Sequence, residues 1–176
     1  MAENGVSSDL TEADAATLLA HEAEVSVGAL PNAALEVAKL CGGHPLALSL
    51  VGAMVRRGFP WGEVHDRLKS VQPQDAHRRN DSIIRAIKLS YEELKKEEQE
   101  RLLELAGEFA KGQLIEEPEI FHLWERNGGM SESESRDVLS VLRDRGLINL
   151  YQGTPNRRVV TLHPLVHQFL RTVSPE

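Results

Sequence analysis

Cysteine and aromatic side chains are scarce in this sequence. Its 176 residues include a single cysteine, Cys41, so no disulfide can form within the chain. Aromatic residues make up 5% of the chain and hydrophobic residues 41%. A core must therefore be built mainly from Leu, Val, Ile and Ala, which favour helices that pack through aliphatic faces. We expect a mainly α-helical, globular protein of one domain or two small ones.

Signals for membranes, nucleic acid and catalysis are also missing. No apolar run reaches the roughly 18 residues of a membrane-spanning helix. The N-terminal residues MAENGVSSDL lack the basic start and apolar stretch of a signal peptide, so we expect a cytoplasmic protein without membrane contact. The formal net charge of −7 argues against broad binding to nucleic acid. No GxxxxGK[ST] loop and no nucleophile-and-base arrangement occur, so this chain alone is not expected to be an enzyme.

Helical periodicity dominates the first 70 residues. Thr11 and Asp14 form a capping box that predicts a helix over residues 10–22, with Leu18 and Leu19 facing inward. The spacing then predicts three more helices: one from Asn32 to Gly42 or Gly43 with Ala34, Leu35, Val37, Ala38 and Leu40 inward; one from Pro45 to Gly58 with Leu46, Leu48, Val51 and Met54 inward; and one from Pro60 that buries Trp61, Val64 and Leu68.

A polar segment divides the chain. Residues 71–81 are aperiodic and contain a proline, which predicts a linker between a helical domain at 1–70 and a second domain at 82–176. The second domain has helical stretches at 82–94, 96–110, 117–127 and 131–146, with an isolated apolar pair at Leu114 and Ile115. Two strands, 147–151 and 157–162, flank the turn segment QGTPN, and a last helix follows Pro164. Three helices and a terminal β-hairpin predict a winged-helix domain.

Two short motifs carry a resemblance to a known family. GGHPLAL at 42–48 resembles the glycine–proline motif of NB-ARC proteins, commonly read as GLPLAL. Some 120 residues later, LINLYQGTPNRRVVTLHPLVHQF resembles the family's wing and its Met-His-Asp motif, here Leu162, His163 and Pro164. SIIRAIKLSYEEL and FHLWERNG are similar to the helices between them. The resemblance covers nearly the whole chain and implies a four-helix ARC-type helical domain followed by a winged-helix domain of a STAND-type signalling ATPase.

This resemblance implies a nucleotide-controlled switch. An upstream P-loop domain would hold ADP or ATP with Mg²⁺, and the present domains would close over the ADP. Pro45 would pack beside the adenine and His163 would reach the β-phosphate, with Gly43 and His44 as further candidate contacts. Pro164 replaces the aspartate of the motif, so any contact made by that acid is absent.

The implied partners lie outside this chain, which alone is expected to hold no cofactor. The resemblance implies the upstream P-loop domain, a C-terminal sensor such as helical repeats, and self-association of the full-length parent. Such switches act in innate immunity, apoptosis and other regulatory signalling.

Other interpretations remain open. The fold could serve as a scaffold or interaction module that never meets nucleotide. A DNA-binding winged helix is a further alternative, although residues 131–146 hold four acidic residues against three arginines. Gly42, Gly43 and Pro45 could simply stop and restart a helix, and His163 could be a capping or core histidine. A metal site at His163 and His167 is disfavoured because no third ligand is evident. Cys41 is better explained as a small buried residue than as a nucleophile.

Overall fold

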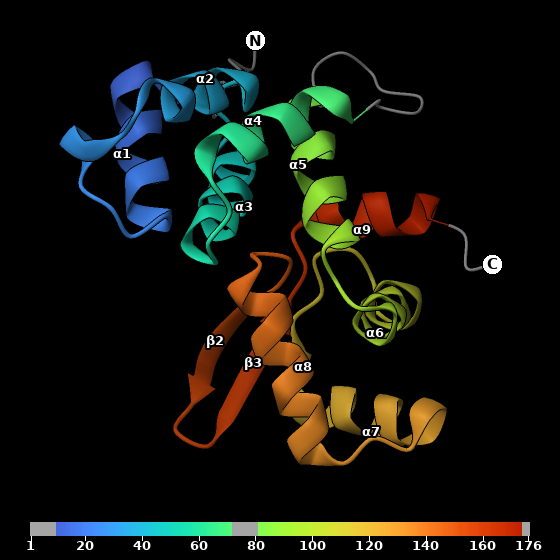
Figure 1. The fold of residues 1–176 in the computed structure, drawn as a ribbon. Coiled ribbons are helices and arrows are strands. Elements are labelled where there is room, and N and C mark those ends of the chain that lie inside the picture. Colours follow the sequence, from blue (N-terminus) through green and yellow to red (C-terminus); the bar gives the residue numbers. More distant parts are fainter. Residues whose placement is uncertain (1–9, 72–80, 174–176) are drawn as a thin grey trace, which may run out of the picture. The chain divides into compact units, whose positions relative to one another are not determined.

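The computed structural model describes residues 10–71 and 81–173 and is mainly helical, as expected from the sequence. The chain divides into two compact units, Met1–Leu89 and Ser90–Glu176, and helix α5 (Asp81–Glu92) passes from one into the other (Figure 1). The predicted linker at 71–81 lies almost wholly outside the described residues. The division into a four-helix ARC-type domain and a winged-helix domain therefore stays a prediction.

Four α-helices precede α5 in the first unit: α1 (Glu12–Glu22), α2 (Asn32–Leu40), α3 (Pro45–Arg56) and α4 (Trp61–Ser70), with a short 3₁₀ turn at Val27–Ala29. Helix α1 packs on α3, and α2 packs on α4. The predicted cap of α1 is confirmed, because the side chain of Thr11 accepts a hydrogen bond from the amide of Asp14. The aliphatic core includes Leu19, Val37, Leu48, Leu50, Val51, Met54, Val64 and Leu68.

Leu35 corrects the prediction for α2. The sequence places it in the core, but its side chain is 42% exposed. Helix α2 buries a narrow stripe, Ala34, Val37 and Cys41, whose members are three or four residues apart and share one face. Leu35 follows Ala34 directly, and a single step along a helix turns the side chain by about 100° out of that stripe. Leu18, Ala38, Leu40, Leu46 and Trp61, also predicted to be inside, are only half-buried.

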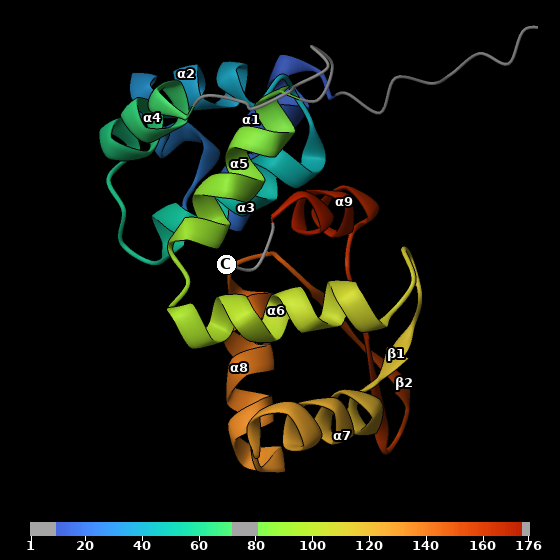
Figure 2. The same ribbon diagram turned by 90° about the vertical axis from the view of Figure 1, so that its right-hand side faces the viewer.

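The second unit combines helices with a small antiparallel sheet. Its elements are α6 (Lys96–Glu108), β1 (Ile115–Glu116), α7 (Glu117–Gly128), α8 (Glu132–Asp144), β2 (Asn149–Thr154), β3 (Arg157–Thr161) and α9 (Pro164–Thr172). The predicted hairpin is confirmed, because β2 and β3 pair from Asn149 with Thr161 to Thr154 with Arg157. Helix α6 lies between α9 and α7 in both views (Figure 2).

Strand β1 is a correction to the predicted isolated apolar pair. Ile115 and Glu116 pair with Val160 and Val159 of β3, so the sheet has the order β1-β3-β2. Ile115 is 1% exposed and Val160 is fully buried, whereas Leu114 is 67% exposed. Only one member of the pair, Ile115, is therefore a core residue, and Leu114 lies outside the strand.

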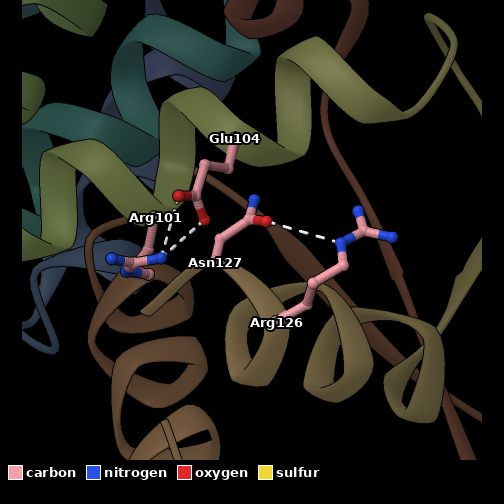
Figure 3. A network of polar contacts seen from close by, with 4 residues as sticks. All are labelled: Arg101, Glu104, Arg126 and Asn127. Carbon is pink, nitrogen blue, oxygen red and sulfur yellow. Dashed lines mark hydrogen bonds and ion pairs between the residues drawn. The ribbon is translucent and has the colours of Figure 1, made fainter. Parts of the chain in front are cut away.

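A buried arginine of α6 packs against the end of α7. Arg101 is 8% exposed, and its Nη1 donates to both carboxylate oxygens of Glu104, at 2.8 and 2.7 Å (Figure 3). A Cβ atom on Gly128, at the end of α7, would lie 2.6 Å from Nη2 of Arg101. On α7 itself, Nε of Arg126 contacts Oδ1 of Asn127 at 3.5 Å. Glycine at position 128 therefore makes room for the guanidinium group.

Candidate functional site

The sequence-predicted site residues fall in two different units, so they form two groups that are described separately. The first group lies in the turn between α2 and α3. Gly42 and Gly43 have φ values of +62° and +69°, in the left-handed region that glycine tolerates best. The amide of Gly42 donates to the carbonyl of Lys39, and that of His44 donates to the carbonyl of Cys41. This turn ends α2 at Leu40 and allows α3 to start at Pro45.

Gly43 is also required by close packing. Its carbonyl accepts a hydrogen bond of 2.9 Å from the amide of Leu10. A Cβ atom at position 43 would lie 2.8 Å from the carbonyl oxygen of Leu10, closer than real Cβ contacts. The glycine therefore has a sufficient structural reason even without a ligand.

His44 and Pro45 form the start of α3. The amide of Leu46 donates to Nδ1 of His44 at 3.2 Å, so the imidazole acts as the N-cap of the helix. Pro45 occupies the first helical position, where its missing N–H leaves no lost hydrogen bond. Both side chains are half-buried. The helix restart predicted from the sequence is confirmed, and the capping role of His44 is additional to it.

A groove of about 680 Å³ opens beside the glycine turn. This volume is within the usual range for small-molecule sites. Its polar lining includes the carboxylates of Glu12 and Glu36 and the ammonium of Lys39, which lies 3.3 Å from Glu36. Such a lining suits a neutral polar ligand better than phosphate, since the two carboxylates would repel anions. The groove is lined by Leu10, Glu12, Ala15, Asn32, Leu35, Glu36, Ala38, Lys39, Gly42 and Gly43.

The second group lies at the start of α9. The amide of Leu165 donates to Nδ1 of His163 at 3.1 Å, and Pro164 occupies the first helical position. His163 is half-buried. The local structure repeats that of His44, Pro45 and Leu46, so His-Pro-Leu forms the same helix start twice. The repeated tripeptide is visible in the sequence, and of the structural roles considered there for His163, the geometry shows the capping role.

His167 has a partner of its own. Its Nε2 lies 3.0 Å from the carbonyl oxygen of Phe109, and because a carbonyl only accepts, Nε2 is the donor. Among residues 10–71 and 81–173, no group of three or more His, Cys, Asp or Glu side chains is placed to hold a metal ion. The metal site at His163 and His167, which the sequence disfavours, gains no support from the geometry of these residues.

The arginines available for DNA contact are engaged within the second unit. On α8, Arg136 pairs with Glu132 at 3.5 Å and Arg143 pairs with Asp144 at 3.0 Å. The next residue, Arg145, donates through Nη1 to the carbonyl of Glu93 at 2.9 Å. On the hairpin, Arg157 and Arg158 pair with Glu116 and Glu117 at 3.0 and 2.7 Å. The phosphates of DNA would have to compete with these ion pairs and with the hydrogen bond of Arg145.

Cys41 is buried at the end of α2. Its side chain is 1% exposed, and burial raises the pKa of the Cys41 thiol to about 12. A thiol with that pKa is protonated and unreactive at neutral pH. The geometry thus favours the packing role over the nucleophile.

Comparison with known proteins gives one informative relative. No protein-family model matches the chain. The chain is 28% identical over 157 residues to the probable disease resistance protein At5g63020 of Arabidopsis thaliana, and the match covers 82% of this chain. The chain spans 17% of that protein's length. Within the described ranges, the longest helices have 13 residues, and none is long and apolar enough to cross a bilayer. By sequence, the chain is therefore similar to one segment of a larger plant disease resistance protein.

Proposed function

We propose that this chain is the nucleotide-sensing and closing module of a STAND-type switch in defence signalling. Its helical part and its hairpin part pack over ADP held by an upstream P-loop domain, and the closed state restrains self-association. The observation that carries the proposal is that His44–Pro45 and His163–Pro164, the two motif positions, have the same rigid helix start. The similarity to a disease resistance protein, which covers 82% of this chain, supports the same reading.

The first unit offers a groove for the adenosine end of the nucleotide, although His44 and Pro45 are not among the residues that line it. The groove beside Gly42 and Gly43 offers apolar surface together with Asn32 and two carboxylates, which can bind a base and ribose hydroxyls. It offers a single ammonium group, Lys39, which is already paired with Glu36. Phosphates would therefore need the P-loop domain and His163, so the isolated chain should bind nucleotide poorly and hydrolyse none.

The test uses the full-length protein, purified with its bound nucleotide. After denaturation, the released nucleotide is identified and counted for wild type, His163→Ala and Pro45→Ala. Two matched controls are His21→Ala, whose side chain is 83% exposed on α1, and Pro118→Ala, another proline in the first turn of a helix. Loss or faster exchange of ADP in the two site variants alone supports the switch.

The same experiment tests the competing role as a scaffold. If all four variants stay folded and keep the wild-type amount of ADP, the two helix starts serve stability only and the nucleotide-independent module is the correct assignment. Steady ATP turnover by the isolated 176-residue chain would contradict both.

A further inference from the structure

We propose that His167 is a positioning residue for His163. This inference rests on the proposed function, because an effect of His167 on ADP release requires that His163 contacts the nucleotide. The side chain of His167 donates through Nε2 to the carbonyl of Phe109 at 3.0 Å, a contact between residues 58 apart in the sequence. It ties the first turn of α9 to the end of α6.

The acceptor is a carbonyl at a helix end. Phe109 is the C-cap residue of α6, and its own amide donates to the carbonyl of Leu105. Carbonyls at the end of a helix lack partners within that helix. His167 supplies such a partner at a half-buried position, where an unsatisfied carbonyl would be costly.

The backbone links His167 directly to His163. The amide of His167 donates to the carbonyl of His163 at 3.0 Å, which closes the first turn of α9. This bond joins the N-cap residue to His167 within a single helical turn. His163 is held from within the helix by the amide of Leu165, and from outside it by the contact of His167 with α6.

The rest of α9 is held by apolar packing. Val166, Phe169 and Leu170 are buried, and the ring of Phe169 meets that of Tyr91 edge-on at 5.7 Å. This buried face sets the approximate rotation of α9, because interdigitated side chains resist rolling, but apolar contacts are themselves non-directional. A hydrogen bond is directional, so the contact of His167 fixes the rotation that aims the side chain of His163.

Three variants of the full-length protein test this role through the rate of ADP release. His167→Ala should release ADP faster than wild type by about 2- to 10-fold, the range that one net hydrogen bond covers. His167→Gln should restore the wild-type rate, because its amide can still donate to Phe109. Thr172→Val is the matched control, since it removes the hydrogen bond from Thr172 to the carbonyl of Phe169 at the other end of α9, and should leave the rate unchanged.

A second measurement separates this inference from the proposed function. In the 176-residue chain, amide hydrogen exchange of Leu165 and the imidazole ¹⁵N resonances of His163 report on the first turn of α9 without nucleotide. His167→Ala should speed that exchange and shift those resonances, and Thr172→Val should do neither.

The outcomes are distinct. If His163→Ala alters ADP release but His167→Ala does not, positioning is overturned and the switch survives. If His163→Ala leaves release unchanged while His167→Ala disturbs His163 in the chain, the switch fails and the coupling of the two histidines stands. An undisturbed His163 in His167→Ala overturns the inference outright.

Discussion

Nδ1 of His163 lies 3.1 Å from the amide nitrogen of Leu165 and accepts its hydrogen bond. The proton of the neutral imidazole must therefore be on Nε2. A contact of neutral His163 with a phosphate would therefore use Nε2–H as the donor, while Nδ1 still caps α9. Protonation of Nδ1 would remove this acceptor and with it the side-chain cap of α9.

We expect this cap to contribute to stability. His163→Ala should lower the free energy of unfolding by about 1 kcal/mol, the usual value of an N-cap side chain. His163→Asn should lower it much less, because asparagine is among the best N-cap residues. Urea unfolding of the chain measures both, and an equal loss in the two variants would contradict the capping role. In ¹⁵N spectra of the wild type, the Nε2–H tautomer should predominate.

The glycine turn offers a matched pair of substitutions. Gly42 and Gly43 have similar positive φ values, so alanine at either position should cost roughly 1 to 2 kcal/mol of backbone strain. At Gly43 the new Cβ atom also meets the carbonyl of Leu10 at 2.8 Å, whereas at Gly42 the nearest atom is Oγ of Ser82 at 3.6 Å. We expect a total of about 3 kcal/mol for Gly43→Ala. Equal unfolding midpoints for the two variants would rule out the contact with Leu10.

Glu134 should make the stability depend on pH. The backbone amide of Ser131 and its hydroxyl, each 2.8 Å away, donate to this carboxylate and lower the pKa of Glu134. A lowered pKa in the folded state contributes stability that is present above the unfolded pKa, about 4.3, and is lost as the pH falls through the folded value.

The test compares Glu134→Gln with wild type in thermal unfolding between pH 6 and pH 3, roughly spanning that value. The variant should lose less stability on acidification than wild type. Glu125→Gln, which removes an exposed carboxylate on α7, should follow wild type. Parallel curves for all three proteins would show that the capping box of α8 does not depend on the charge of Glu134.

Cys41 should resist modification in the folded chain. With its thiol buried and its pKa raised to about 12, a disulfide reagent at pH 8 should react only through opening of the fold. We expect labelling to be slow in buffer and fast in denaturing urea. Rapid labelling without denaturant would mean that α2 opens readily near its C-terminus.

Helices could be predicted where apolar spacing and caps agree. Thr11 and Asp14 mark the start of α1, and Pro45 marks that of α3, because a cap residue or a fixed φ acts locally. The capping role of His44 could not be predicted from propensity, since Ser, Thr, Asp and Asn are the usual caps. Its function depends on a particular rotamer that only the folded turn defines.

Contacts between residues far apart in the chain could not be predicted from the sequence. Nothing local makes Ile115 a strand residue, because two residues carry no periodicity and their pairing depends on Val159 and Val160. The bond from His167 to Phe109 is similarly invisible, since it joins residues 58 apart. His163 and His167 share a helical face in the sequence, but the partner of His167 comes from α6.

Strand β1 also bears on how the second unit assembles. Its two residues pair with Val159 and Val160 of β3, and α7, α8 and β2 lie between the two strands in the sequence. Closing such a long loop costs chain entropy before any contact repays it. We expect β1 to dock last during folding and to leave first on unfolding. Detachment of the segment that joins α6 to α7 would then loosen the sheet while the helices remain intact.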